Sequence, residues 1–255
     1  MVIGAASILW ALVVWKWQDP FTAVYTAYEQ RQLASRYEKR LATYHLPPIR
    51  EQGTAQPGIA QPGIAQPSIA TEQRRIALAA RRYRLSLKQG DPLGRIKVRR
   101  LGLNAVLVAG TDHGSLTKGP GWERSTFLPG EGQLIYIAGH RTTYSAPFAH
   151  IDALRRGDLV TIEVPYGTFA YVIRSHTIVP ANDLSQLRSH GREVVALQAC
   201  HPRFFATHRY IAYAVLVRVV PRAGRPFIPR GKQPVSLTSP LPKITHVSRD
   251  VTPAG

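Results

Sequence analysis

The sequence predicts an all-β domain, a barrel or a sandwich, with additional segments at both ends. From Gly94 to Val220, short apolar runs alternate with turn residues at a spacing typical of small all-β domains. The chain has 255 residues, of which 44% are hydrophobic, so it can bury one core with residues to spare. Twelve of its 20 prolines lie outside residues 91–221, which favours one domain with appendages over two domains.

Each predicted strand is a short apolar run. The runs are RIKVRRLGL, AVLVAG, QLIYIAG, DLVTIEV, TFAYVIRSHTIV, EVVALQA and YIAYAVLVRVV. Turn-forming residues between them predict turns at Leu128–Gly132, Arg156–Asp158 and Pro165–Gly167. The segment Ala146–Leu154 is the one stretch in this region that is predicted to be a helix.

The first residues are apolar. Residues 2–15 carry no charge, and Lys16 and Asp19 follow them. This run is shorter than the roughly 20 residues of a bilayer span. It lacks the basic start and the cleavage site of a signal peptide, and Trp10, Trp15 and Trp17 suit a membrane interface. We expect residues 1–18 to be a membrane anchor; a buried N-terminal helix is the alternative.

Residues 19–90 are predicted to be a helical stalk and a linker. A helix is expected over residues 19–45, beginning at Pro20. The five-residue repeat from Gln56 to Ala70 has Pro or Gly at fixed spacing, which predicts an extended spacer. Residues 72–88 are expected to form a basic helix that is solvated beside the domain, in preference to lying on an anionic surface. The proline-rich, basic residues 222–255 are expected to be disordered.

The formal net charge of +18 implies attraction to polyanions, which include nucleic acid, anionic lipid and wall polymers. The single cysteine excludes an intramolecular disulfide and a cysteine-rich zinc site. No carboxylate pair suits glycosidase chemistry, and no glycine-rich loop suits nucleotide binding. We expect neither a cofactor nor a metal.

The candidate catalytic residues lie at the ends of three apolar runs. Cys200 ends one run, Arg209 begins the next run nine residues later, and His140 ends the run QLIYIAGHR. A thiol with an ordinary pKa near 8.5 is only about 3% ionised at pH 7, so a cysteine nucleophile needs a neighbouring base or cation. His140 is the expected proton acceptor and donor, and Arg209 is expected to stabilise an oxyanion.

Other interpretations of these residues remain open. A lone cysteine at the end of a strand is often a small buried hydrophobe. His201 or His208 is an alternative base, although adjacent residues on a strand point to opposite faces. Arg141 is an alternative cation, and it is expected to be a structural or a solvated partner. Four further histidines are expected to be ordinary polar residues: His113, His150, His176 and His190.

The stretch from Gly132 to Ile162 and the stretch VVALQACHPRFFATHRYIAYA together resemble the sortases, most closely the class E sortases of actinobacteria. The resemblance covers roughly residues 91–221. It implies an eight-stranded β-barrel and a cysteine transpeptidase. The family's catalytic histidine, cysteine and arginine fall on His140, Cys200 and Arg209. The family usually has two threonines before the cysteine, where this chain has Ala196 and Ala199.

The resemblance implies a single-pass membrane protein with an extracellular catalytic domain. Its expected partners are the membrane, secreted proteins with a C-terminal sorting signal and an amine of the peptidoglycan precursor, with no role for nucleic acid. The expected reaction cleaves an LPXTG- or LAXTG-type motif between Thr and Gly through a thioacyl enzyme. The alternatives are a catalytically impaired relative, another Cys–His hydrolase of the L,D-transpeptidase or papain type, and a non-enzymatic protein that binds wall polymers.

Overall fold

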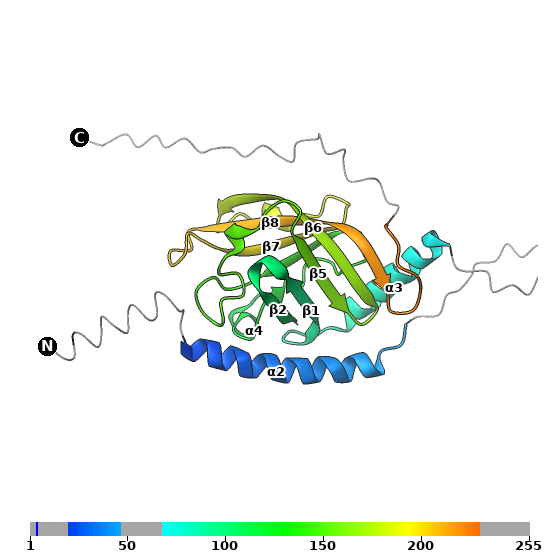
Figure 1. Ribbon diagram of the computed structural model, residues 1–255, viewed down its shortest axis with the longest axis horizontal. Coiled ribbons are helices and arrows are strands. Elements are labelled where there is room, and N and C mark those ends of the chain that lie inside the picture. Colours follow the sequence, from blue (N-terminus) through cyan, green and yellow to red (C-terminus); the bar gives the residue numbers. More distant parts are fainter. Residues whose placement is uncertain (1–3, 5–19, 47–67, 230–255) are drawn as a thin grey trace, which may run out of the picture.

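The computed structural model describes residue 4, residues 20–46 and residues 68–229. In these residues, eight strands close into a barrel in the order β1-β2-β3-β4-β7-β8-β6-β5 (Figure 1). The all-β prediction is therefore confirmed, and the fold is a barrel and not a sandwich. The strands are β1 (Pro92–Val98), β2 (Leu103–Ala109), β3 (Gly121–Trp122), β4 (Leu134–Ala138), β5 (Leu159–Val164), β6 (Gly167–Pro180), β7 (Val194–His201) and β8 (His208–Pro221).

Two parallel pairs interrupt an otherwise antiparallel barrel. They are β2–β3 and β4–β7. In the second pair, Leu134 lies beside Val194 and Ala138 beside Gln198. Since parallel neighbours point their carboxyl ends the same way, the residues that follow β4 meet the last residues of β7 at one end of the barrel.

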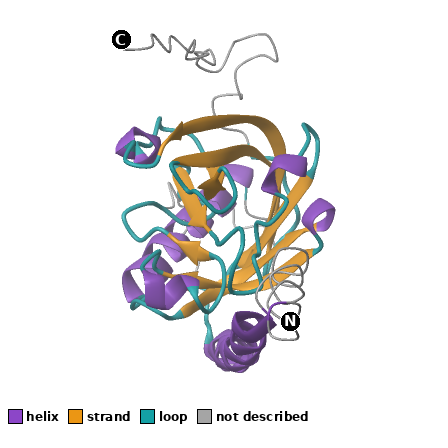
Figure 2. Cartoon of the chain, turned by 90° about the vertical axis from the view of Figure 1, so that its left-hand side faces the viewer, coloured by secondary structure: helices purple, strands orange, loops and turns teal. Residues whose placement is uncertain are grey.

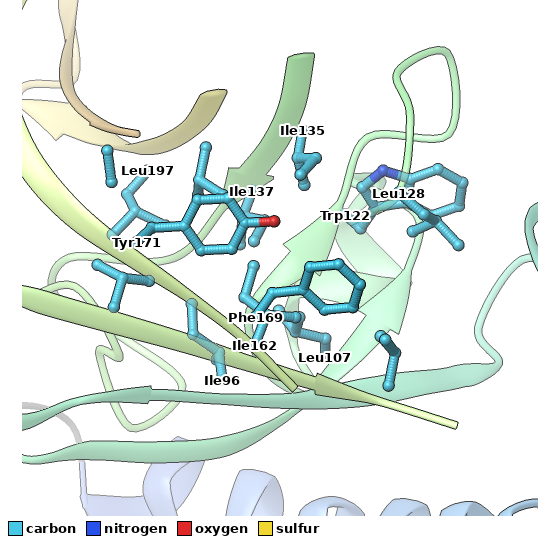
Figure 3. Packing of buried hydrophobic residues seen from close by; sticks show 14 of the residues in the cluster. Ile96, Leu107, Trp122, Leu128, Ile135, Ile137, Ile162, Phe169, Tyr171 and Leu197 are labelled. Carbon is cyan, nitrogen blue, oxygen red and sulfur yellow. The ribbon is translucent and has the colours of Figure 1, made fainter. Parts of the chain in front are cut away.

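The interior of the barrel is filled by large apolar side chains from most of its strands. Figure 3 shows that Trp122, Phe169 and Tyr171 pack with aliphatic side chains of β1, β2, β4, β5 and β7. Burial of this apolar surface is the main stabilising contribution to such a fold.

A smaller apolar cluster lies on the other face of β4, β6, β7 and β8. It comprises Leu134, Tyr136, Val179, Ala196 and Ile211. Along β4 and β7, odd-numbered side chains therefore point into the main core and even-numbered ones point to the smaller cluster, as the two-residue period of a strand requires.

Helix α2 (Pro20–Thr43) confirms the helix predicted over residues 19–45, but it is packed along the barrel beside β1 and β2 (Figures 1 and 2). The amide of Gln30 donates to the carbonyls of Val106 and Lys118, and its oxygen accepts from the Val106 amide. Arg40 forms an ion pair with Asp91. The helical stalk predicted here is therefore a helix that is packed against the barrel and forms part of the folded unit.

Helix α3 (Ile69–Ser86) begins inside the predicted linker, because the Ser68 hydroxyl accepts from the amide of Thr71 and caps the helix. One face of the helix is buried in the main core through Ile76, Ala79 and Tyr83. The basic helix predicted over residues 72–88 is thus present, with Arg74, Arg81 and Arg82 exposed beside the domain, and its apolar face is part of the core. The packed unit extends to the N-terminal side of the predicted boundary at residue 91.

Two other local predictions need correction. Segment Ala146–Leu154 is not an α-helix: it contains turns and a short 3-10 helix, η2 (Ile151–Ala153). The positive φ of Ala146, 36°, is incompatible with a helix at that residue. The first residues of the predicted disordered tail are also ordered, since Phe227 is buried and forms a β-bridge with Val219.

The remaining short helices are α4 (His113–Leu116), η1 (Arg99–Leu101) and η3 (Leu184–Leu187). The predicted anchor at residues 1–18 lies outside the described residues, apart from residue 4, as do most of the repeat and residues 230–255. Among the described residues, no helix has the length and apolar character needed to cross a membrane.

Candidate active site

The predicted trio lies at three adjacent strand ends, on one face of the sheet. Cys200 on β7 is directly paired with Arg209 on β8. In β4 and β7, Ala138 is paired with Gln198, and the amide of Gly139 donates to the carbonyl of Gln198, so the pairing continues toward His140 and Cys200. The two-residue alternation assigns all three residues to the face of the smaller apolar cluster. The fold therefore brings the ends of β4, β7 and β8 to one edge of the sheet, while the catalytic roles of the three residues stay a prediction.

His140 has the features of a proton-transfer group. Its Nε2 atom is buried and has no hydrogen-bond partner within the described part of the chain. An unpaired buried polar atom is rare in folded proteins and is often found at functional sites. Burial lowers the pKa of His140 below its ordinary value, and the nearby His113 lowers it further. The imidazole is therefore neutral at neutral pH and can accept a proton.

Arg209 is fixed by the loop that joins β7 to β8. Its Nη1 atom donates to the carbonyl of Ala206 at 2.8 Å and to that of His208 at 3.0 Å. A guanidinium has five N–H donors. The donors on Nε and Nη2 have no hydrogen-bond partner among the residues that the structure describes, so they remain available to a substrate carbonyl.

The other candidate histidines lie elsewhere. His201 and His208 are paired with each other one position beyond Cys200 and Arg209, and the alternation therefore places them on the opposite face. His201 contacts Arg141, whose Nη1 lies 3.2 Å from the His201 Nδ1. Burial and the Arg141 charge lower the pKa of His201. Neither histidine shares the face of the thiol.

Arg141 has the structural role expected for it. Its side chain is buried and forms an ion pair with Asp152, Nη2 to Oδ2, at 2.5 Å. It also donates to the carbonyls of Ala149 and Cys200. Arg141 therefore connects the segment after His140 to the end of β7, close to the nucleophile.

The two alanines at the usual threonine positions are both completely buried. Ala199 belongs to the main core and Ala196 to the smaller cluster on the other face. The site therefore has no hydroxyl at either position, and the alanine methyls are part of the packing beneath Cys200.

Tyr144 and His113 are site residues that sequence reasoning missed. The Tyr144 ring lies 5.0 Å from the His140 ring and 6.0 Å from the His113 ring, measured between centroids. His113 was expected to be an ordinary polar residue, yet it begins α4 more than twenty positions before His140. The pairing of β3 with both β2 and β4 brings these segments together, and no local spacing indicates it.

Comparison with known proteins agrees with this geometry. The sortase domain family matches residues 96–217. Sortase D of Bacillus subtilis is 31% identical over 128 residues, which cover 49% of this chain and 63% of that protein. Sortase SrtE1 of Streptomyces coelicolor is 30% identical over 101 residues, which cover 35% of this chain and 28% of that protein. The matches span less than two thirds of either relative.

A solved structure of similar fold is a Clostridium perfringens Sortase D5 transpeptidase, with a TM-score of 0.55 and 20% identity over 74% of this chain and 98% of that chain. At this identity the likeness concerns the fold alone. Both a Sortase D and a class E sortase are among the sequence relatives. The barrel, the trio at its strand ends and the family model agree: residues 96–217 of this chain match the sortase domain.

Proposed function

We propose that this chain is a cysteine transpeptidase that cleaves a sorting motif between Thr and Gly and joins the new carboxyl end to a cell-wall amine. The observation that carries the proposal is the shared face of His140, Cys200 and Arg209 at three adjacent strand ends. A thiol, a base and a permanent cation in this order suit acyl transfer through a thioester.

In the first half-reaction, neutral His140 takes the proton of Cys200. The thiolate then attacks the threonine carbonyl carbon. Arg209 stabilises the negative charge on the carbonyl oxygen with its free N–H donors. As the C–N bond breaks, His140 returns the proton to the leaving glycine amine. The thioester keeps the acyl group on Cys200.

In the second half-reaction, an acceptor amine attacks the thioester carbon and gives its proton to His140. The C–S bond breaks, a new amide forms, and Cys200 leaves as a thiolate that recovers the proton. Water can replace the amine, in which case the product is a free carboxylate and the reaction is hydrolysis.

The finer parts of the proposal rest on the sequence. The motif is of the LPXTG or LAXTG type, and the donors are secreted proteins with a C-terminal sorting signal. The apolar residues 2–15 are proposed to hold the chain in the cell membrane with the barrel outside. The net charge of +18 supports residence near anionic lipid and wall polymers.

The test uses the full chain, quenched fluorescent peptides of both motif types and a glycine-type or diaminopimelate-type amine. Mass spectrometry of the products separates joining from hydrolysis. Wild-type chain is expected to join peptide to amine, and Cys200→Ala is expected to do neither reaction. His140→Ala is expected to lose activity, whereas His190→Ala, at an exposed histidine, is the matched control and is expected to retain it.

The competing functions give different results. If the peptides are cleaved in a reaction that needs Cys200, but are not joined to any of the amines supplied, the result supports a hydrolase. A wild-type chain that leaves every motif intact while wall fragments bind it supports a non-enzymatic, wall-binding protein, for which the net charge of +18 is the favouring observation.

A further inference from the structure

A cavity of about 500 Å³ lies beside the candidate active site, between helix α2 and helix α4. Its walls are mostly apolar and aromatic. They are formed by Phe21, Thr22, Tyr25, His113, Gly114, Thr117 and Tyr144. Its volume is in the range of small-ligand sites. The Tyr144 ring, which is one wall, also contacts the His140 ring.

The cavity lies on a defined side of the catalytic trio. Strand order places β4 between β3 and β7, so that His140 separates the β2–β3 side of the sheet from Cys200. Helix α4 connects β2 to β3 and is on that side. Arg209 lies on the far side of Cys200, on β8. A molecule held in the cavity therefore reaches Tyr144 and His140 before it reaches the thiol.

This order determines which reactant the cavity suits. The acyl oxygen must face Arg209, whereas the amine that attacks the thioester must give its proton to His140. The amine therefore approaches from the His140 side, where the cavity is. Aromatic walls pack well on methylene groups and attract an ammonium group.

We propose that this cavity is the acceptor subsite and that it takes a primary amine carried on an aliphatic stem. This inference rests on the proposed function. Tyr25 and Tyr144 contact the stem, and the amine extends past Tyr144 to His140.

Helix α2 lines this subsite and also forms hydrogen bonds with the loop that carries Tyr144. The amide of Tyr144 donates to the Thr22 hydroxyl at 2.9 Å, and the hydroxyl of Ser145 donates to the carbonyl of Ala23 at 3.4 Å. Tyr144, Ser145 and Ala146 all have positive φ, at 53°, 59° and 36°. Such backbone is strained in residues other than glycine and persists where its surroundings hold it. The first turn of α2 thus fixes the loop that carries the shared wall.

The test measures how the thioacyl enzyme divides between amine and water. The ratio of joined to hydrolysed product at fixed amine concentration does not depend on how fast the thioacyl enzyme forms. The full chain is supplied with a motif peptide and either 1,5-diaminopentane or glycinamide. Wild type is expected to prefer the diamine. Tyr25→Ala is expected to lower the diamine ratio at least about fivefold, the effect of losing one aromatic contact.

Two variants control for indirect effects. Tyr25→Phe keeps the ring and is expected to keep the ratio. Tyr28→Ala removes an exposed tyrosine of α2 that is not in the cavity wall, and is expected to leave the ratio unchanged.

An unchanged diamine ratio in Tyr25→Ala overturns the subsite, as does an equal fall in Tyr28→Ala or an equal fall with glycinamide. If wild type shows no cleavage that depends on Cys200, the proposed function fails instead, and the subsite fails with it.

Discussion

Cys200 and Arg209 are directly paired across strands β7 and β8. Because residues opposite each other in an antiparallel pair point to the same face, both side chains leave the sheet on one face. One guanidinium nitrogen donates to the carbonyl of Ala206 in the β7–β8 loop and to that of His208, the first residue of β8. The Nη1 atom of Arg209 therefore binds the protein backbone, while Nε and Nη2 are available to bind a substrate oxygen.

The first prediction distinguishes a catalytic role of Arg209 from a role in holding the loop. Arg209→Ala is expected to lower kcat by about 10²–10³-fold, the usual effect of losing an oxyanion donor. Arg209→Lys keeps the charge but loses the planar fork, so we expect an intermediate rate. Steady-state peptide cleavage measures both. Arg218→Ala, at an exposed arginine of the same strand, is the matched control and is expected to keep the wild-type rate. A full rate in Arg209→Ala, with thermal unfolding at a lower temperature, contradicts a catalytic role and leaves the loop role alone.

The second prediction concerns the pH dependence of activity. The pKa of His140 is lowered below 6.5, first by burial and then by His113. The acidic limb of the kcat/KM profile, where neutral His140 becomes protonated, is therefore expected below pH 6.5. His113→Ala removes a repelling charge, so the pKa of His140 rises and the acidic limb moves to higher pH. His190→Ala is the control, and a limb that moves equally in both variants is evidence against the electrostatic effect.

The same shift has a consequence for stability. With its pKa lowered in the folded state, His140 binds fewer protons when folded than when unfolded as the pH falls below 6.5. The contribution of His140 to the free energy of unfolding is therefore complete above pH 6.5. It is lost as the pH falls through the pKa that His140 has in the folded protein. We expect the free energy of unfolding to decline less between pH 7 and pH 5 in His140→Gln than in wild type. Denaturant titrations at several pH values measure this, and a slope equal to that of wild type contradicts it.

The trio was predictable because each member lies at one end of an apolar run, and strand ends gather at one edge of a sheet. The strands were predictable where alternation was long; β3 has only two residues and gave no signal. The packing of α2 was not predicted: Leu33 is buried against Val106 and Val108, but the helix also contacts the barrel through Gln30 and Arg40, which resemble a solvated face in the sequence. The proximity of Tyr144 and His113 arises from strand order, which a linear pattern does not contain.

The fourth prediction tests Arg141 as a structural residue. Arg141→Met keeps much of the length but leaves the carbonyls of Ala149 and Cys200 without this donor. Asp152 is half-exposed and can be solvated when the ion pair is lost. We expect the free energy of unfolding to fall by about 2–3 kcal/mol. Denaturant unfolding is the measurement, with the exposed Arg192→Met as a neutral control. A loss below about 0.5 kcal/mol contradicts the role.

The last prediction concerns Ala199, where the family usually has threonine. Ala199 is completely buried in the main core and paired with Tyr210, so a threonine adds a methyl group and a hydroxyl to a filled interior. Overpacking costs about 1–3 kcal/mol, and an unpaired buried hydroxyl adds to that cost. We therefore expect Ala199→Thr to lower the denaturant midpoint at an unchanged m-value, without a gain in the rate of cleavage. Ala199→Ser adds the hydroxyl alone and is expected to cost less. Equal or greater stability in Ala199→Thr means that the core beneath Cys200 has space for the second methyl, and a higher rate means that the missing hydroxyl limits the chemistry of this chain.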